Sequence, residues 1–404
     1  PGRPPNPLKI EAIDLFYVAL PKITRTADGT QDSLVVRVRT DNRLEGWGEC
    51  DASPLVSMAA YVMPMSHSNI INIREALLGE TLDSPEDVVR LRNKAGEYGL
   101  DIQQLDHAVA GADIAMWDVL GKHLGEPVWK LIGHDASYKK LPYASVLFGD
   151  DPAETRTVAD SIVERDFRAA KFGWGPMGRG SLADDIALVQ AARDGLGPDA
   201  KLMVDAGVIW GDDVDAAYER AVAFADLGVI WLEEPIRTEE IGAYKALSDK
   251  VRANGINIGV AGGEGADYYR AADDMMTNAG LDFVQIDVGR IGGITEAKRV
   301  ADKAHELGVQ YVNHTFKSHL SVAASIHVFA GYEEFDLTEY PAGDSELILG
   351  LTAPTGIFRD VDGFVRASDK PGLGVEVNLD AIREYQRQVK IEIDGEVLFE
   401  SSQP

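Results

Sequence analysis

The chain has 404 residues, a length typical of two or three domains, and its 45% hydrophobic and 26% charged residues exclude disorder as the main state. Asp and Glu outnumber Lys and Arg by 66 to 39, which gives a net charge of −27. This charge argues against nucleic acid and anionic membrane surfaces as partners, although a bound cation would still admit an anionic substrate.

The cysteine content and the apolar runs of the chain indicate its cellular compartment. Cys50 is its single cysteine, so no internal disulfide can form and a reducing compartment is expected. The first ten residues hold no apolar signal-peptide core, and no apolar run approaches 18 residues. We therefore expect a cytoplasmic protein without a membrane span.

The N-terminal region predicts a sheet followed by helices. Strands are expected at 7–20 and 33–49, the second being a hairpin that turns at Thr40-Asp-Asn-Arg43. Helices are expected at 53–66, 69–79, 84–98 and 102–124. Ser84 and Gly125 are suited to cap the last two.

From about residue 141, short apolar runs alternate with amphipathic stretches. Eight runs read as strands: Leu141–Phe148, Ala169–Trp174, Leu202–Ala206, Val229–Glu233, Ile256–Gly262, Phe283–Val288, Val309–Asn313 and Asp336–Tyr340. Helical patterns separate most of them, at 153–167, 183–196, 213–227, 239–254, 267–279, 294–307 and 317–330. A glycine follows most of these helices, as a left-handed C-terminal position favours: Gly197, Gly228, Gly255, Gly280, Gly308 and Gly331.

This alternation predicts an α/β fold in which parallel strands close into a (β/α)8 TIM-type barrel. An open doubly wound sheet is the alternative, but no dinucleotide loop follows the first strand. The tail predicts a strand pair, 389–393 and 396–400, that packs back on the N-terminal region. We expect an α+β capping domain at 1–140, a barrel at 141–372 and a returning segment at 373–404.

Ionisable side chains recur at the ends of the predicted barrel strands, where the active site of such a barrel lies. They are Lys171, Asp205, Glu233, Glu234, Glu264, Asp287, His314 and Glu339. Acids that face one cavity repel each other unless a cation is present. Three carboxylates from adjacent strands, with positions left open for water or substrate, suit Mg2+.

Each of these residues alone favours an ordinary structural role. A single acid after a strand is more often a helix cap than a ligand, and Glu264 could bind an amide in its Gly-rich loop. His314 alone could be a satisfied buried histidine, which is also the interpretation of His107, His123 and His327. It is the recurrence at consecutive strand ends that favours a functional site.

The sequence resembles the enolase superfamily, in its mandelate racemase-like subgroup, over nearly its whole length. The motifs that carry the resemblance are Gly46-Trp-Gly-Glu49, Asp113-Ile-Ala-Met-Trp-Asp118, Glu233-Glu-Pro235, Gly263-Glu264, Asp287 with Gly292-Gly293, and Asn313-His314. The resemblance implies that Asp205, Glu233 and Glu264 bind Mg2+. It also implies that His314 acts as the general base together with Asp287, and that Glu339 hydrogen-bonds the enolate oxygen.

One departure from the family pattern bears on the reaction. Where relatives read Lys-x-Lys, this chain has Lys171-Phe172-Gly173, and the family's Asp-x-Asn reads Asp205-Ala206-Gly207. With Gly173 in place of the second lysine, one face of the substrate lacks its base. This favours abstraction of the proton α to a carboxylate by His314, followed by loss of water, and so predicts an acid-sugar dehydratase.

Other functions stay open at this stage. An epimerase, racemase or cycloisomerase could use Lys171 as the second base. The chain could instead be a barrel that only binds sugar acids, but such a protein would not need the His–Asp pair. A nucleotide-binding loop is a third alternative, but the glycines at 289–293 and 262–265 do not fit its pattern.

A small carboxylate substrate and a homo-oligomer are expected. Specificity is expected from capping loops near 20–33 and 50–68. Four residues are candidates for setting specificity. Lys22, Arg25 and His67 lie in or near these loops, and Trp174 lies at the end of the second predicted barrel strand.

Overall fold

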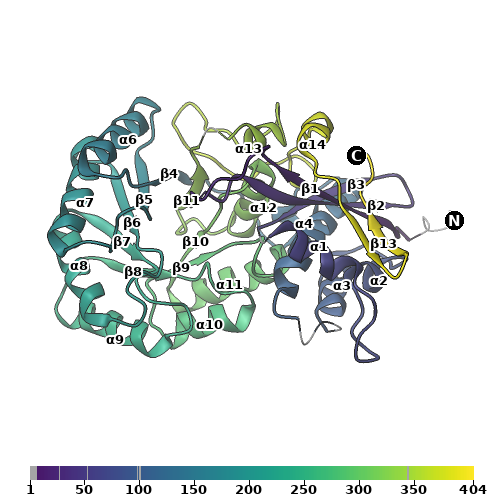
Figure 1. The fold of residues 1–404 in the computed structure, drawn as a ribbon, viewed down its shortest axis with the longest axis horizontal. Helices are drawn as coiled ribbons and strands as arrows, with labels where there is room; N and C mark the ends of the chain where they lie inside the picture. The colour runs from purple at the N-terminus through teal and green to yellow at the C-terminus, as the bar shows by residue number, and fades with distance from the viewer. Residues whose placement is uncertain (1–6, 27, 52, 98, 100–101, 344) are drawn as a thin grey trace.

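The computed structural model describes residues 7–404 apart from 27, 52, 98, 100–101 and 344. Figure 1 shows a barrel of strands ringed by helices on one side and a smaller sheet with its helices on the other. The C-terminal segment, in yellow, lies beside the purple N-terminal strands. Both ends of the chain thus contribute to the part of the molecule that adjoins the barrel.

The smaller sheet is antiparallel, in the order β1-β2-β3. Its strands are β1 (Ile10–Ala19), β2 (Asp32–Thr40) and β3 (Glu45–Cys50). The expected hairpin at 33–49 is confirmed, with Val38 paired to Gly46 across the turn. Arg37 and Arg39 both bind Asp14 on the neighbouring strand, at 2.8 and 2.7 Å.

The helix α4 (Leu105–Leu124) packs unusually close to strand β3. A Cβ atom at Gly46 would lie 2.0 Å from the carbonyl oxygen of Ala115, and one at Gly48 would lie 2.0 Å from that of Gly111. Because no side chain fits at either position, the Gly-Trp-Gly motif is explained by this close approach of helix and strand.

The remaining helices of this region are close to expectation. They are α1 (Pro54–Val62), α2 (Ile73–Leu77) and α3 (Pro85–Glu97). The first is shorter than expected because Pro64 follows its C-cap, Met63. Ser84 accepts the amide of Asp87 at 3.2 Å, and Gly125 ends α4 with a φ of 71°, so both predicted caps are confirmed.

Eight parallel strands form the barrel sheet, in the order β10-β9-β8-β7-β6-β5-β4-β11. Their bounds agree with the predicted runs to within a few residues: β4 (Leu141–Leu147), β5 (Ala169–Gly173), β6 (Lys201–Asp205), β7 (Val229–Glu233), β8 (Gly259–Gly262), β9 (Phe283–Ile286), β10 (Gln310–Asn313) and β11 (Leu337–Pro341). The predicted closed barrel, not the open sheet, is therefore the fold.

Asn313 bridges the two ends of this sheet. Its side-chain oxygen accepts the backbone amide of Glu339 at 2.9 Å, and its side-chain nitrogen donates to the carbonyl of Glu339 at 3.1 Å. The Asn313 amide thus replaces a backbone pair between β10 and β11. All these groups are buried, so each would otherwise lack a partner.

Helices follow the first seven barrel strands, as predicted. They are α6 (Pro152–Glu164), α7 (Leu182–Leu196), α8 (Val214–Asp226), α9 (Ile241–Ala253), α10 (Tyr269–Thr277), α11 (Ile294–Leu307) and α12 (His319–Val328). Five of the six glycines that follow helices have the expected positive φ. Gly331 does not, and a Cβ there would lie 2.3 Å from His134, so this glycine serves close packing.

Three short helices were not predicted, because they are too short to show a helical period: α5 (Val128–Leu131), α13 (Glu346–Gly350) and α14 (Leu379–Tyr385). The tail then forms β12 (Lys390–Ile393) and β13 (Glu396–Glu400). It lies against the N-terminal sheet, where Arg387 donates its amide to the carbonyl of Tyr17 at 2.7 Å and Phe399 lies beneath Arg74.

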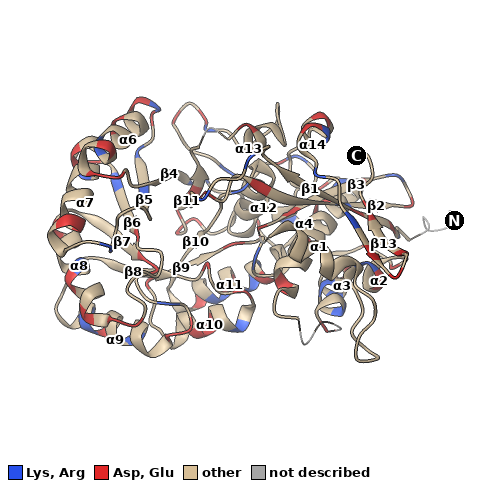
Figure 2. Ribbon diagram, viewed as in Figure 1, with Lys and Arg blue, Asp and Glu red and all other residues tan. Residues whose placement is uncertain are grey.

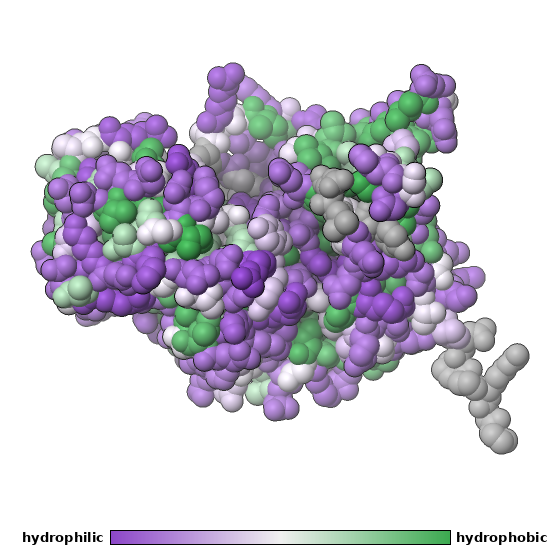
Figure 3. Space-filling model, turned by 90° about the horizontal axis from the view of Figure 1, so that it is seen from below, coloured by the Kyte–Doolittle hydropathy of each residue, from purple (hydrophilic) through white to green (hydrophobic). Residues whose placement is uncertain are grey.

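The surface reflects the acidic composition. Figure 2 shows acidic residues over both parts of the molecule, and Figure 3 shows a mainly hydrophilic face with separate apolar patches. Among the helices of the described residues, none combines the length and apolar character needed to cross a membrane.

Candidate active site

The predicted site residues share one end of the barrel. Because the strands are parallel, their carboxyl ends meet at a single mouth. No residue of the set is more than 9% exposed. The set comprises Lys171 on β5, Asp205 and Glu233 at the ends of β6 and β7, Glu264, Asp287 and His314 just beyond β8, β9 and β10, and Glu339 on β11.

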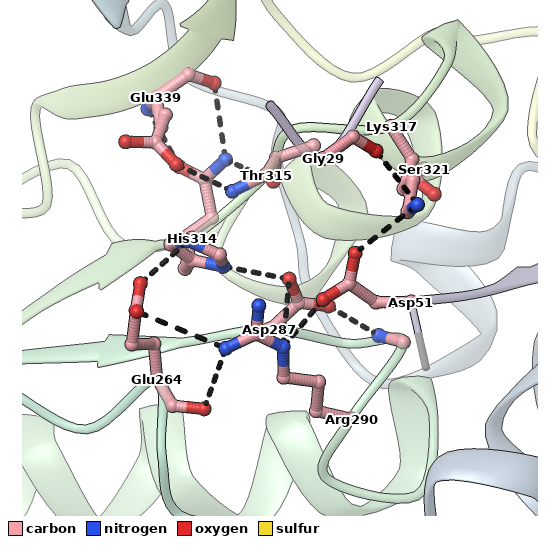
Figure 4. A network of polar contacts seen from close by, with 12 residues as sticks. Gly29, Asp51, Glu264, Asp287, Arg290, His314, Thr315, Lys317, Ser321 and Glu339 are labelled. Carbon is pink, nitrogen blue, oxygen red and sulfur yellow. Dashed lines mark hydrogen bonds and ion pairs between the residues drawn. The ribbon is translucent and has the colours of Figure 1, made fainter. Parts of the chain in front are cut away.

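His314 lies between two carboxylates (Figure 4). Its Nδ1 is 2.7 Å from Asp287, and its Nε2 is 2.5 Å from Glu264. The backbone amide of Gly289 donates to the second oxygen of Asp287 at 2.7 Å. Asp287 is therefore held in place and in turn orients the imidazole ring.

The two carboxylates also set the charge of this histidine. Burial opposes the charged imidazolium, but Glu264 and Asp287 outweigh it and raise the pKa of His314 well above its ordinary value. Burial likewise opposes ionisation of Glu264, yet His314, Arg290 and Lys171 hold the pKa of that carboxyl well below its usual range. Without metal or substrate, His314 and Glu264 thus form a buried ion pair.

Lys171 joins the acids of two strands. Its Nζ lies 2.7 Å from Glu233 and 2.6 Å from Glu339. Burial disfavours the ammonium, but these two carboxylates raise the pKa of Lys171 well above its ordinary value, so the lysine stays charged. It supplies a fixed positive charge inside the mouth of the barrel.

Glu339 and Glu233 are further held by neutral donors. The backbone amide of Thr315 donates to Glu339 at 2.7 Å, and the hydroxyl of Tyr143 donates to its other oxygen at 3.2 Å. Glu233 accepts from Trp231 at 3.1 Å and from Gln285 at 2.6 Å. Both carboxylates therefore have defined orientations, which sequence patterns alone could not supply.

The acids proposed to bind metal lie on three adjacent strands, with Asp205 in register with Glu233. Asp205 accepts the amide of Gly207 at 2.8 Å. Within the described part of the chain, however, no three His, Cys, Asp or Glu side chains are arranged as ligands of one ion. Glu233 faces Lys171 and Glu264 faces His314 instead, so the ligand set remains a prediction.

The chemistry of these donors nevertheless fits a divalent cation. Burial and the neighbouring charges of Glu233 and Glu264 raise the pKa of Asp205 well above its usual range. The Glu264 oxygen that lies 2.5 Å from Nε2 of His314 has no hydrogen bond of good geometry. A cluster of buried oxygen donors that repel one another is the environment that a hard cation relieves.

Glu234 is a further buried acid, next to the predicted ligand Glu233. It is 5% exposed and has a φ of 44°, in the left-handed region. Burial, together with Glu264 and Asp205, raises the pKa of Glu234 well above its usual range. It therefore adds to the acidic cluster from the same β7 loop.

Three charged residues near the site were missed at the sequence level (Figure 4). Asp51, just beyond β3, is hydrogen-bonded to Arg290 and lies 3.8 Å from Lys317. Arg290 lies 3.8 Å from Glu264 and 4.0 Å from Asp287. The sequence pointed to them only by their closeness to the predicted motifs. Arg290 follows Asp287 by three residues, and Asp51 follows Gly46-Trp-Gly-Glu49 by two.

The N-terminal region is fastened to the barrel beside this network. Glu49 is fully buried and accepts hydrogen bonds from Ser33, Ser318 and Ser321. Lys317 donates to the carbonyls of Gly29 and Asp32, both at 2.7 Å. These bonds hold part of the 20–33 loop next to His314.

The four candidate specificity residues stay outside these contacts. Lys22, Arg25 and His67 are exposed, and Trp174 is 37% exposed with its ring over Gly207. Among the described residues, none of them forms a hydrogen bond or ion pair with the seven site residues. Their role in specificity therefore stays a prediction.

Known proteins share this architecture. Residues 13–133 match the mandelate racemase/muconate lactonizing enzyme N-terminal domain, and residues 154–381 match the enolase C-terminal domain-like family. D-galactarolactone cycloisomerase of Agrobacterium fabrum is 30% identical, over 87% of this chain and 91% of that protein. D-galactonate dehydratase of Variovorax paradoxus is 28% identical, over 86% and 90%.

Solved structures agree with this assignment. The crystal structure of a predicted mandelate racemase from Rhodobacter sphaeroides has a TM-score of 0.93 and 45% identity, over 98% of this chain and all of that one. A mandelate racemase/muconate lactonizing protein from Paracoccus denitrificans, complexed with magnesium, has a TM-score of 0.78 and 26% identity, over 95% and 99%. The chain therefore belongs to the mandelate racemase/muconate lactonizing enzyme family of the enolase superfamily.

Proposed function

We propose that this protein is a Mg2+-dependent dehydratase that converts a sugar acid, an aldonate or an aldarate, into a 2-keto-3-deoxy acid. The observation that carries the proposal is the buried His314–Asp287 pair, whose Nδ1 and carboxylate oxygen are 2.7 Å apart, opposite a strand position that holds no second base. The relatives include a sugar-acid dehydratase, the D-galactonate dehydratase of Variovorax paradoxus.

Asp205, Glu233 and Glu264 would hold the cation, with Glu234 as an additional buried acid close by. When bound, Mg2+ supplies positive charge that stabilises the negative charge developing on the substrate carboxylate. Metal binding would require Glu233 and Glu264 to give up Lys171 and His314 as partners. Lys171 would then be available to the substrate carboxylate, and His314 to the α-carbon.

His314 is the base in this proposal. Its Nδ1–H donates to Asp287, which leaves Nε2 as the proton acceptor once it no longer faces Glu264. The C–H bond α to the carboxylate breaks and its proton moves to Nε2. The electron pair forms the C=C bond as the β-hydroxyl leaves with a proton from His314, and the resulting enol becomes the 2-keto acid.

Gly173 leaves the proposed reaction with one base. A Cβ atom at this position would lie 2.8 Å from the Cβ of Asp205, so a lysine could not be placed there without moving that acid. A 1,1-proton transfer needs a base on each face of the α-carbon. Elimination needs one, and this supports dehydration over racemisation.

A cycloisomerase or epimerase is the second candidate. It is favoured by Lys171, whose Nζ lies in the same cluster as Glu233 and Glu339, and by the cycloisomerase of Agrobacterium fabrum among the relatives. In this alternative, Lys171 would act on the face opposite His314. It would have to lose its proton, which the two adjacent carboxylates oppose.

The test is a panel of aldonates and aldarates incubated with the protein and Mg2+, with 2-keto acids as the product scored. Dehydration of one or more members supports the proposal. Parallel proton NMR in D2O distinguishes the alternative: deuterium entering recovered substrate, with no keto product on any member, would reject dehydration in favour of epimerisation.

A further inference from the structure

The outer side of the barrel beside its last strand lacks a long covering helix. The other seven barrel strands are each followed by a helix of nine or more residues, whereas β11 is followed by α13, which has five. A cavity of about 920 Å³ opens there, and its lining includes Arg165, Phe167, Arg168, His319, Tyr340 and Arg359. Its volume falls in the range of small-molecule sites. We call it the barrel-side cavity.

This cavity is separate from the catalytic mouth. Tyr340 follows Glu339 along β11, and neighbouring side chains of a strand point to opposite faces. Glu339 points into the barrel toward Lys171, whereas the hydroxyl of Tyr340 donates to the carbonyl of Ile357 outside it, at 2.8 Å. A ligand here would therefore not occupy the substrate position.

Two arginines share one aromatic ring in this cavity. The guanidinium carbons of Arg359 and Arg165 lie 4.1 and 5.6 Å from the centre of the Phe167 ring. Arg168 lies over Phe364 at 4.7 Å. Stacking on a ring fixes the plane of a guanidinium group and leaves its N–H edge free to bind an oxyanion.

These cations lack acidic partners. Among the described residues, no carboxylate oxygen lies within 4.0 Å of any of the three guanidinium groups, although the chain has 66 acids against 39 Lys and Arg. Arg165 and Arg168 each donate to a backbone carbonyl, of Ala342 and Asp362, at 2.6 and 2.7 Å. Like charges gathered without counter-charge are unfavourable, and an anion would relieve their repulsion.

The acids in the lining are directed elsewhere. Asp360 and Asp362 lie 3.4 and 3.7 Å from Lys139. Asp360 also accepts the amides of Asp362 and Phe364, at 2.9 and 3.0 Å. Asp166 forms no ion pair among the described residues. With Lys139 included, four cations at the cavity face three aspartates, which leaves an excess of one positive charge.

A buried neutral donor completes the site. His319 is 5% exposed, and its Nδ1 accepts the amide of Ile357 at 3.0 Å. The neutral ring therefore carries its proton on Nε2, which has no hydrogen-bond partner among the described residues. Burial lowers the pKa of His319, so the ring stays neutral near pH 7.

We propose that the barrel-side cavity is a second ligand site that binds the phosphate group of a small phosphorylated molecule, through Arg165, Arg359 and His319. Two guanidinium groups and one imidazole N–H offer many hydrogen-bond donors. A carboxylate has only two oxygens, in one plane, whereas a phosphate group has three that can accept these bonds. Phe358 and Leu349, which are 61% and 44% exposed, offer apolar surface to the organic part. This inference does not depend on the proposed reaction.

Calorimetric titration of the metal-free protein with inorganic phosphate, phenyl phosphate and succinate tests the site. We expect saturable binding of both phosphates, tighter for phenyl phosphate, and weaker binding of succinate. The double variant Arg165→Gln, Arg359→Gln should lose at least tenfold in affinity. The control Arg156→Gln removes one positive charge from α6 outside the cavity, as each single variant Arg165→Gln and Arg359→Gln does within it. Arg156 pairs with Asp160 at 3.0 Å, and this control should stay within twofold.

The proposal fails if phosphate does not saturate, if succinate binds more tightly than phenyl phosphate, or if the double variant binds phosphate as the unmodified protein does. The single variants Arg165→Gln and Arg359→Gln, each melted thermally, separate lost binding from lost folding. Light scattering is measured on all of them. A change in molecular mass with unchanged phosphate affinity would show instead that the cavity is a contact between copies of the chain.

Discussion

The roles of single residues in this site follow from their partners. Asp287 and Glu264 approach His314 from its two nitrogens, and Lys171 lies between Glu233 and Glu339. In the proposed reaction, His314 moves a proton, whereas Lys171 only supplies charge. Two substitutions test that division.

Replacement of His314 by Asn is expected to abolish turnover while Mg2+ affinity survives, because in the proposed reaction the side chain removes the α-proton and is not a metal ligand. Removing a general base lowers rates by about 10²–10⁴-fold. Isothermal titration with Mg2+ and the sugar-acid assay measure the two effects on one preparation. Loss of metal binding in this variant would show that the roles of His314 and the acids are misassigned.

Replacement of Lys171 by Met is expected to destabilise the metal-free protein. It leaves Glu233 and Glu339 buried without their shared ammonium, and removing one partner of a buried ion pair costs about 3–5 kcal/mol. Urea unfolding measures the change. Excess Mg2+ should recover part of the loss if Glu233 is a ligand, whereas equal losses with and without Mg2+ would argue against that role.

The sequence predicted the site residues because each follows an apolar strand at a recurring interval. Apart from the pair of His314 and Asp287, which the resemblance implied, their contacts were not predicted. Asp51, Arg290 and Lys317 lie in loops, and they meet only because the N-terminal region is seated on the barrel. No periodic pattern along the chain records a contact of that kind.

At the scale of helices and strands, the long elements were predictable and the short ones were not. The barrel helices show an apolar face at helical spacing, whereas α5, with four residues, completes only about one turn. The prediction that Gly331 takes a left-handed C-terminal conformation was wrong. Glycine is required there because the ring of His134 leaves no room for a side chain. Sequence alone cannot separate these two uses of glycine.

The contact of β3 with α4 gives a prediction at this scale. Gly48→Ala would place a Cβ 2.0 Å from the carbonyl oxygen of Gly111, so helix and strand must separate. Overpacking of this kind costs about 1–3 kcal/mol. The matched control is Gly242→Ala in α9, where no atom lies within 4 Å of a Cβ and φ is not positive. Equal losses of unfolding free energy in the two variants would contradict the packing explanation.

At the scale of the whole molecule, side chains in the interior join segments that are distant in the sequence. Glu49 joins the N-terminal sheet to α12, and Asn313 joins the two ends of the barrel sheet. His327 on α12 joins two further segments. The amide of Trp129 donates to its Nδ1 at 2.9 Å, and its Nε2 donates to the carbonyl of Leu373 at 3.0 Å.

His327 can keep both bonds only while it is neutral, because protonated Nδ1 cannot accept the Trp129 amide. Burial accordingly lowers its pKa from 6.5 to about 4. Between these values the unfolded chain binds more protons than the folded one, so the contribution of His327 is complete above pH 6.5 and is lost as the pH falls toward 4. At 1.36 kcal/mol per pKa unit, the loss amounts to about 3 kcal/mol.

Urea unfolding of the unmodified protein and of His327→Gln at several pH values between 7 and 4.5 measures this contribution. Glutamine can accept and donate in roughly the same directions without titrating, so its unfolding free energy should fall less steeply with acid. Carboxylates elsewhere titrate equally in both proteins and cancel in the difference. Parallel curves over this range would show that His327 does not tie these three segments together through its neutral ring.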